Sequence, residues 1–186
     1  MKPLHLQRKH DNAVSAEGQT DARQYLTFQL GGDVFAIGIL AIREILEYLK
    51  PTHVPLMPPF IRGVMNLRGS VVPVIDLSLR FARGETEINR RTCVVIIEVE
   101  GEDQLQLIGI LVDAVHEVLA IPDADIEPPP QFGSKIRVDF IAGMAKLDGH
   151  FIVLLNVNKV LSVDEMALIS SLGQQETAAE TQTEKA

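Results

Sequence analysis

Alternating apolar and polar positions predict a chain built from short β-strands joined by tight turns. Residues 25–30 place Leu26, Phe28 and Leu30 on one face, and two glycines then lead into an apolar run at 34–37. Alternation with a period of two on both sides of a glycine-rich turn is typical of a β-hairpin. We therefore expect a hairpin here.

A second hairpin is predicted between residues 64 and 75, with Arg68 and Gly69 as its turn. Pro73 lies inside the second of its two apolar runs. Proline has no N–H group for a ladder hydrogen bond, so this strand should lie at a sheet edge or carry a bulge at that residue.

The stretch of residues 60–81, which contains this second hairpin, occurs again at 140–161. Its residues Phe60, Ile61, Gly63, Leu67 and Gly69 recur at a constant offset as Phe140, Ile141, Gly143, Leu147 and Gly149. Glu44 likewise recurs as Glu117 at a smaller offset, and the extra residues of the second copy fall in a proline-rich loop at 123–131. Self-similarity of this kind indicates an internal duplication. We interpret the chain as two copies of one small β unit, with lobe one at about 24–81 and lobe two at about 91–161.

The other patterns predict four more strands, three helical segments and three irregular segments. The strands are expected at residues 42–48, 92–99, 105–112 and 115–121. The helical segments are expected as a single turn at 59–62, a short helix at 77–81 capped by Asp76, and an amphipathic closing helix at 163–172. The irregular segments are a flexible arm at 1–23, a linker at 83–91 and a disordered tail at 173–186.

The size of the two copies bears on how they are arranged. Each holds about 60 residues, at which an isolated domain buries too little surface to be more than marginally stable. The copies should therefore pack together. Short strands with strong turn signals predict a mainly β fold of two small closed or nearly closed barrels. A groove between the lobes would follow, and such clefts are common docking places.

The composition excludes several classes of function. With 46% hydrophobic residues and no apolar run near the ~20 residues of a spanning helix, the sequence predicts a soluble, cytoplasmic chain without a signal peptide. A formal charge of −8 without a basic cluster argues against nucleic acid and against direct membrane insertion. The single cysteine, Cys93, lies in an apolar run and is expected to be a buried, inert thiol.

The residues that could carry chemistry are scattered. We find no paired nucleophile and base, no metal-ligand set and no glycine-rich phosphate loop, so we expect neither enzyme activity nor a cofactor. A small-molecule-binding or enzymatic double barrel that uses the interlobe groove stays open as the alternative.

Arg68 is the sharpest candidate for a functional residue. It is either a water-exposed turn residue or an arginine presented on a rigid hairpin tip, able to pair with a carboxylate of a partner. The second copy has Asp148 at this position. Because aspartate would suit the turn in both copies, the arginine favours the functional interpretation.

Four stretches together closely resemble the CheW family of bacterial chemotaxis coupling proteins. They read FIRGVMNLRGSVVPVIDL, IREI, GILVDAVHEVL and FIAGMAKLDGHFIVLLNV, and the resemblance covers about residues 24–172. It implies a fold of two SH3-like five-stranded β barrels packed around a shared core. It also implies a single-domain, non-enzymatic adaptor, located at receptor arrays on the inner face of the membrane, that links chemoreceptor cytoplasmic domains to the regulatory domain of the histidine kinase CheA.

The resemblance also implies which residues contact the receptor. By matching positions these are Ile42, Glu44, Ile45, Gly63, Arg68, Cys93, Val115 and Val118. Residues that contact the kinase are expected at strand ends and loops of both lobes. If Gly63 serves only the receptor-facing surface, Gly63→Arg should disrupt binding without unfolding the chain.

Overall fold

The computed structural model describes residues 21–101, 103–130, 139–162, 164–168 and 171. Strands dominate this part of the chain. They are β1 (Ala22–Leu30), β2 (Asp33–Gly38), β3 (Ile42–Glu47), β4 (Ile61–Leu67), β5 (Ser70–Asp76), β6 (Cys93–Glu100), β7 (Leu105–Val112), β8 (Ala114–Pro122), β9 (Ile126–Glu127), β10 (Ile141–Leu147) and β11 (His150–Leu155). The short helices between or after the strands are η1 (Ile39–Ala41), α1 (Leu77–Arg80), η2 (Asp123–Asp125) and η3 (Val157–Lys159).

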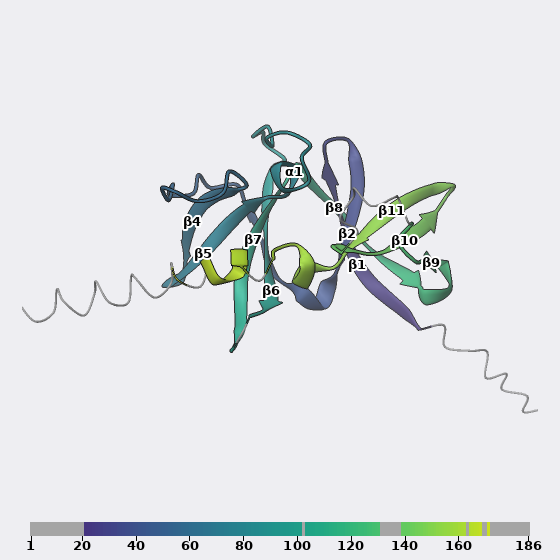
Figure 1. Ribbon diagram of the computed structural model, residues 1–186. Helices are drawn as coiled ribbons and strands as arrows, with labels where there is room; N and C mark the ends of the chain where they lie inside the picture. Colours follow the sequence, from purple (N-terminus) through teal and green to yellow (C-terminus); the bar gives the residue numbers. More distant parts are fainter. Residues whose placement is uncertain (1–20, 102, 131–138, 163, 169–170, 172–186) are drawn as a thin grey trace, which may run out of the picture.

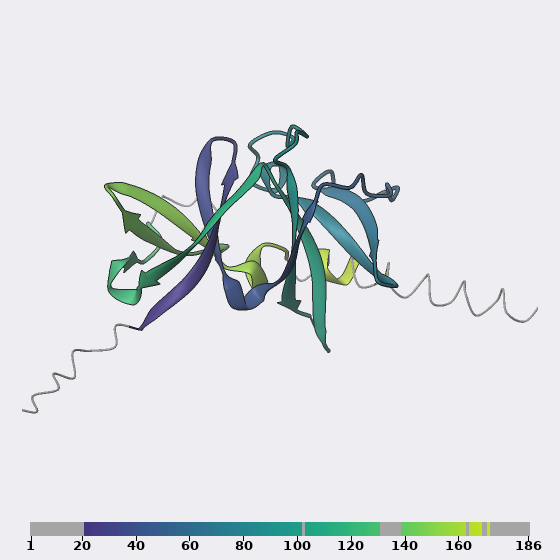
Figure 2. The same cartoon turned by 180° about the vertical axis from the view of Figure 1, so that it is seen from behind.

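The strands form two sheets that lie side by side (Figures 1 and 2). One sheet has the order β8-β1-β2-β11-β10-β9 and the other β3-β6-β7-β5-β4. Most neighbouring strands are antiparallel, whereas β11 and β2, and β5 and β7, run parallel. The prediction of a mainly β fold in two units is therefore confirmed, with six strands in one sheet and five in the other.

The sheets do not follow the two copies of the duplicated unit. The hairpin β1–β2 pairs with β8 and β11 from the second half of the chain. The hairpin β6–β7 pairs in turn with β3 and β5 from the first half. Each sheet thus takes strands from both copies, so the lobes expected at 24–81 and 91–161 do not correspond to separate sheets.

One hydrophobic core is shared by the two sheets. Phe28 of the six-stranded sheet lies in the same cluster as Ile75 and Ile110 of the five-stranded sheet, and all three are at most 1% exposed. Each sheet also has a smaller cluster of its own, one around Leu154 and one around Val94. The exchange of hairpins places apolar residues of both copies in the shared core, which couples the two sheets.

Pro73 lies inside the five-stranded sheet, so the prediction of an edge strand is wrong. Its strand, β5, is flanked by β4 and β7. Pairing with β7 begins at Val74, one residue after the proline, so Pro73 takes no place in that ladder. The irregularity of this hairpin is in β4, where Arg62 is an extra residue between Ile61 and Gly63.

The helical turn predicted at 59–62 is also wrong. Ile61 donates its N–H to the carbonyl of Pro58 at 2.9 Å, which closes a tight turn, and Ile61 already belongs to β4. Prolines that suit a first helical turn suit a β-turn equally well.

The two other predicted helices are confirmed within the described residues. The Asp76 side chain accepts the N–H of Leu79 at 3.2 Å and so caps α1. Residues 164–168 and 171 are helical. Ser162 and Glu165 form a capping box, with N–H to side-chain distances of 2.6 and 3.3 Å, at the start of this closing helix.

The first strand starts earlier than predicted. Ala22 pairs with Pro122 of β8, so Ala22 and Arg23 belong to β1 and not to a flexible arm. The predictions for residues 1–20 and for the tail at 173–186 lie outside the described residues. Within the part that the structure describes, no helix is long and apolar enough to cross a membrane.

Candidate functional site

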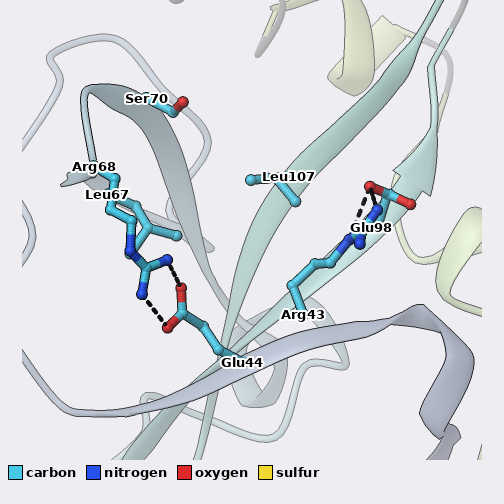
Figure 3. Close-up of a pocket in the computed structure, with 7 residues that line it drawn as sticks. All are labelled: Arg43, Glu44, Leu67, Arg68, Ser70, Glu98 and Leu107. Carbon is cyan, nitrogen blue, oxygen red and sulfur yellow. Dashed lines mark hydrogen bonds and ion pairs between the residues drawn. The ribbon is translucent and has the colours of Figure 1, made fainter.

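The turn of the β4–β5 hairpin borders a cavity of about 510 Å³ on the five-stranded sheet (Figure 3). We call this cavity the hairpin pocket. Its lining residues come from β3, the β4–β5 hairpin, β6 and β7, and they are Arg43, Glu44, Leu67, Arg68, Ser70, Glu98 and Leu107. Two arginines, two glutamates and two leucines therefore share one small surface.

Arg68 and Glu44 form a two-pronged ion pair across this pocket. The Nη1 and Nη2 atoms of Arg68 donate to Oε1 and Oε2 of Glu44 at 2.7 and 3.1 Å (Figure 3). The hydrogen bonds from Arg68 hold the pKa of Glu44 below its ordinary value, and those to Glu44 raise the pKa of Arg68. The arginine side chain is still 77% exposed, so the pair fixes the hairpin tip against β3 and stays open to a partner.

Arg43 and Glu98 form a second ion pair at the other side of the pocket (Figure 3). Both Nε and Nη2 of Arg43 donate to the same oxygen of Glu98. The sequence interpretation missed these two residues, because strict alternation along β3 puts Arg43 and Glu44 on opposite faces. In the structure Arg43 is a bulged residue between Ile42 and Glu44, and neighbouring side chains can then line one cavity.

The structure brings only two of the eight predicted contact residues, Glu44 and Arg68, into the hairpin pocket. Ile42 and Ile45 lie on the same edge strand, β3; Ile42 packs against the shared core, and Ile45 is 43% exposed. Val115 and Val118 lie on β8, at the edge of the other sheet. Val118 is 50% exposed, so each sheet presents an apolar residue on an edge strand.

The sequence interpretation placed Gly63 on the partner surface. The structure shows that Gly63 also lets two backbone segments pack closely. Its φ is +140°, and a Cβ atom at this position would lie 2.1 Å from the carbonyl oxygen of Thr52. Thr52 and Val64 exchange backbone hydrogen bonds of 2.8 and 2.9 Å, which holds this segment against β4. No side chain fits there, so the expectation that Gly63→Arg leaves the fold intact is contradicted.

Cys93 is half-buried, so the expectation of a fully buried thiol is wrong. It is the first residue of β6, where it pairs with Glu47 of β3 and Val112 of β7. Its Sγ donates to the carbonyl of Arg91 at 3.2 Å, and its side chain packs against the shared core. The Cys93 side chain therefore contributes to packing at the start of β6.

A second cavity, of about 640 Å³, lies on the six-stranded sheet beside η1. Its lining includes the apolar residues Tyr25, Ile39 and Leu155, and Leu40 on its rim is 98% exposed. The charged lining residue, Arg23, pairs with Asp123 at 3.2 Å. Across the described residues, no three His, Cys, Asp or Glu side chains are grouped to hold a metal ion.

Known proteins match this chain over most of its length. The family of CheW-like domains matches residues 24–165. The chemotaxis protein CheW of Klebsiella aerogenes is 34% identical over 157 residues, which span 84% of this chain and 92% of that protein. Protein FrzA of Myxococcus xanthus is 31% identical over 153 residues, which span 81% of this chain and 92% of that protein.

A solved structure matches the fold as well. The crystal structure of the scaffolding protein TtCheW from Thermoanaerobacter tengcongensis superposes with a TM-score of 0.70 at 33% sequence identity. The match covers 77% of this chain and 95% of that one.

Proposed function

This chain belongs to the family of CheW-like proteins, and from that premise we propose that it is a non-enzymatic adaptor of chemosensory signalling. In this proposal it couples the cytoplasmic tips of chemoreceptors to the regulatory domain of a CheA-type histidine kinase. Its place in the cell is then the cytoplasm, at receptor arrays on the inner face of the membrane.

The observation that carries the proposal is the Arg68–Glu44 pair at the rim of the hairpin pocket. Its two residues lie in two of the stretches that resemble the family, and the pair holds the Arg68 side chain at a fixed place while leaving it 77% exposed. A rigid and exposed guanidinium suits recognition of an acidic side chain on another protein.

Apolar side chains on the two edge strands, β3 and β8, supply the second part of the proposed receptor contact. Ile45 on β3 and Val118 on β8 are 43% and 50% exposed, and Ile42 and Val115 pack on the shared core behind them. Exposed aliphatic side chains on a rigid sheet suit the apolar face of an amphipathic helix of a partner. The proposed receptor surface thus joins charge at Arg68 to apolar contact on β3 and β8.

The kinase contact is proposed for strand ends and loops away from that surface. Two interfaces on one rigid scaffold strengthen each other, because binding one partner raises the effective concentration of the other. The adaptor therefore needs only modest affinity at each site.

A kinase assay tests this proposal. Purified chain, a receptor cytoplasmic fragment and the CheA-type kinase of the same cell are combined, and kinase autophosphorylation is followed. We expect the receptor to change the rate of autophosphorylation only when the chain is present. If the receptor controls the kinase equally well without the chain, the coupling role is wrong.

A further inference from the structure

The turn that carries Arg68 has an unfavourable residue for its backbone conformation. Arg68 and Gly69 have φ values of 50° and 85°, so both lie in the left-handed region. A two-residue hairpin turn of this kind prefers Asn-Gly or Asp-Gly, because a long side chain is strained at positive φ. An arginine at the first turn position needs support from elsewhere.

The second copy builds the same turn from a favoured pair. Asp148 and Gly149, at the tip of β10–β11, have φ values of 48° and 80°. Aspartate tolerates the left-handed conformation well. Two positions before it stands Lys146, whose ammonium group has only donors and so cannot accept the N–H of Gly149.

The first copy has Asn66 where the second has Lys146. The Asn66 side-chain oxygen accepts the N–H of Gly69 at 2.9 Å and closes the turn from inside. The first copy, which has the strained Arg68, therefore also has a side-chain acceptor for the turn, Asn66. The second copy has the favoured Asp148 and no such acceptor at the matching position, Lys146. This difference between the copies suggests that the asparagine compensates for the arginine.

We infer that Asn66 is a positioning residue of the hairpin pocket, which acts through Arg68. By holding the turn closed it keeps the arginine in the left-handed conformation from which its guanidinium meets both oxygens of Glu44. Asn66 is exposed and is not among the residues that line the pocket, so its effect is indirect. The inference rests on the proposed role of Arg68 in partner binding.

The test uses the full chain and follows the titration of the Glu44 carboxyl group by NMR. In Asn66→Ala, Arg68 should lose its fixed position, and the pKa of Glu44 should move up toward its ordinary value, in the same direction as in Arg68→Ala. Asn66→Ser, whose hydroxyl oxygen still accepts an N–H in a turn, should keep the lowered pKa. Lys146→Ala, the matched change in the second copy, should leave Glu44 unaffected.

A merely structural role for Asn66 would lower the melting temperature and leave the titration of Glu44 as it is. An Asn66→Ala chain with native Glu44 titration would therefore overturn the inference, provided that Arg68→Ala shifts it. An Asn66→Ser chain that titrates like Asn66→Ala would also overturn it, because the acceptor would not be what matters.

Capture of a receptor cytoplasmic fragment separates this inference from the proposed function. We expect Asn66→Ala to weaken capture as Arg68→Ala does. If both variants shift the Glu44 titration but neither weakens capture, the proposed binding role of the pocket fails and the positioning role stands. If only Arg68→Ala shifts the titration and weakens capture, the positioning role fails and the proposed function stands.

Discussion

At the scale of single residues, the two copies differ most clearly at the tips of their repeated hairpins. Arg68 and Asp148 have nearly the same backbone conformation but opposite charge. Glu44 and Glu117 occupy matching positions on β3 and β8, so the first copy pairs opposite charges where the second has two acidic residues. At these matching positions the five-stranded sheet thus has an ion pair, and the six-stranded sheet has two acidic residues.

Arg68→Ala should separate binding from stability. An exposed ion pair is screened by water and contributes little to stability, so we expect the melting temperature to change by only a few degrees. Capture of a receptor fragment should fall, because the guanidinium is lost. Asp148→Ala is the matched control, and equal capture by both variants and the native chain would reduce Arg68 to a turn residue.

The Glu44–Arg68 pair should also depend on pH. Because the folded pKa of Glu44 lies below the unfolded one, its stabilising contribution is present above the ordinary value of 4.5 and is lost as pH falls through the folded pKa. We expect the difference in melting temperature between the native chain and Glu44→Gln to shrink in that window. A difference that is constant down to the folded pKa would show that the charge of Glu44 has no part in it.

Gly63 should tolerate no side chain. Gly63→Ala places a methyl group against the Thr52 carbonyl at a φ of +140°, and overpacking of this kind costs about 1–3 kcal/mol before backbone strain is added. Gly38→Ala is the control, since no atom lies within 4 Å of its added Cβ. Chemical denaturation of both variants checks this, and equal stabilities would contradict the packing role.

At the scale of elements, a buried carboxylate ties the segment between the copies to α1. Asp76 is 0% exposed and accepts the N–H of Thr86 at 3.0 Å and its hydroxyl at 2.8 Å. The bulged Arg62 approaches the same carboxylate at 3.7 Å. The segment that the sequence presents as a polar linker is therefore anchored at Thr86.

Thr86→Val should destabilise the chain by about 1–3 kcal/mol, because it leaves a buried carboxylate oxygen short of a hydrogen bond. Thr86→Ser keeps the hydroxyl group and should stay close to the native stability. Urea denaturation measures both, and a valine variant as stable as the serine variant would show that the hydroxyl bond contributes nothing.

Local patterns predicted most elements because turns and alternation act over a few residues. The hairpin at Gly31, the strand that became β3 and the cap at Asp76 follow from such signals. The place of Pro73 inside the sheet and the bulge at Arg43 depend on which strands pair across the fold. These features depend on pairing between residues that are distant in sequence, so local patterns could not show them. For this reason the sequence interpretation missed Arg43 and Glu98 of the hairpin pocket.

At the scale of the whole molecule, the exchange of hairpins makes the two sheets depend on each other. Strands β1 and β2 find their neighbours β8 and β11 only in the second half of the chain. The sequence shows the duplication, but the matched spacing of residues within each copy is compatible with separate lobes and with exchanged hairpins alike. Only the pairing of strands distinguishes the two arrangements.

Neither half of the chain should fold alone. A fragment of residues 21–82 leaves β1 and β2 without β8 and β11, and leaves Phe28 without most of the shared core. We expect such a fragment to lack dispersed amide signals in NMR, and a mixture with residues 83–172 to regain them. A folded fragment 21–82 would show that the exchanged pairing is not needed for stability.

The measurement that tests the central claim most directly is co-capture of both proposed partners by the native chain. A receptor cytoplasmic fragment and a CheA-type kinase are offered to the immobilised chain, first separately and then together. The account predicts binding to each, with more of both retained when they are offered together. Binding to neither, or binding of one partner that excludes the other, would contradict the coupling role.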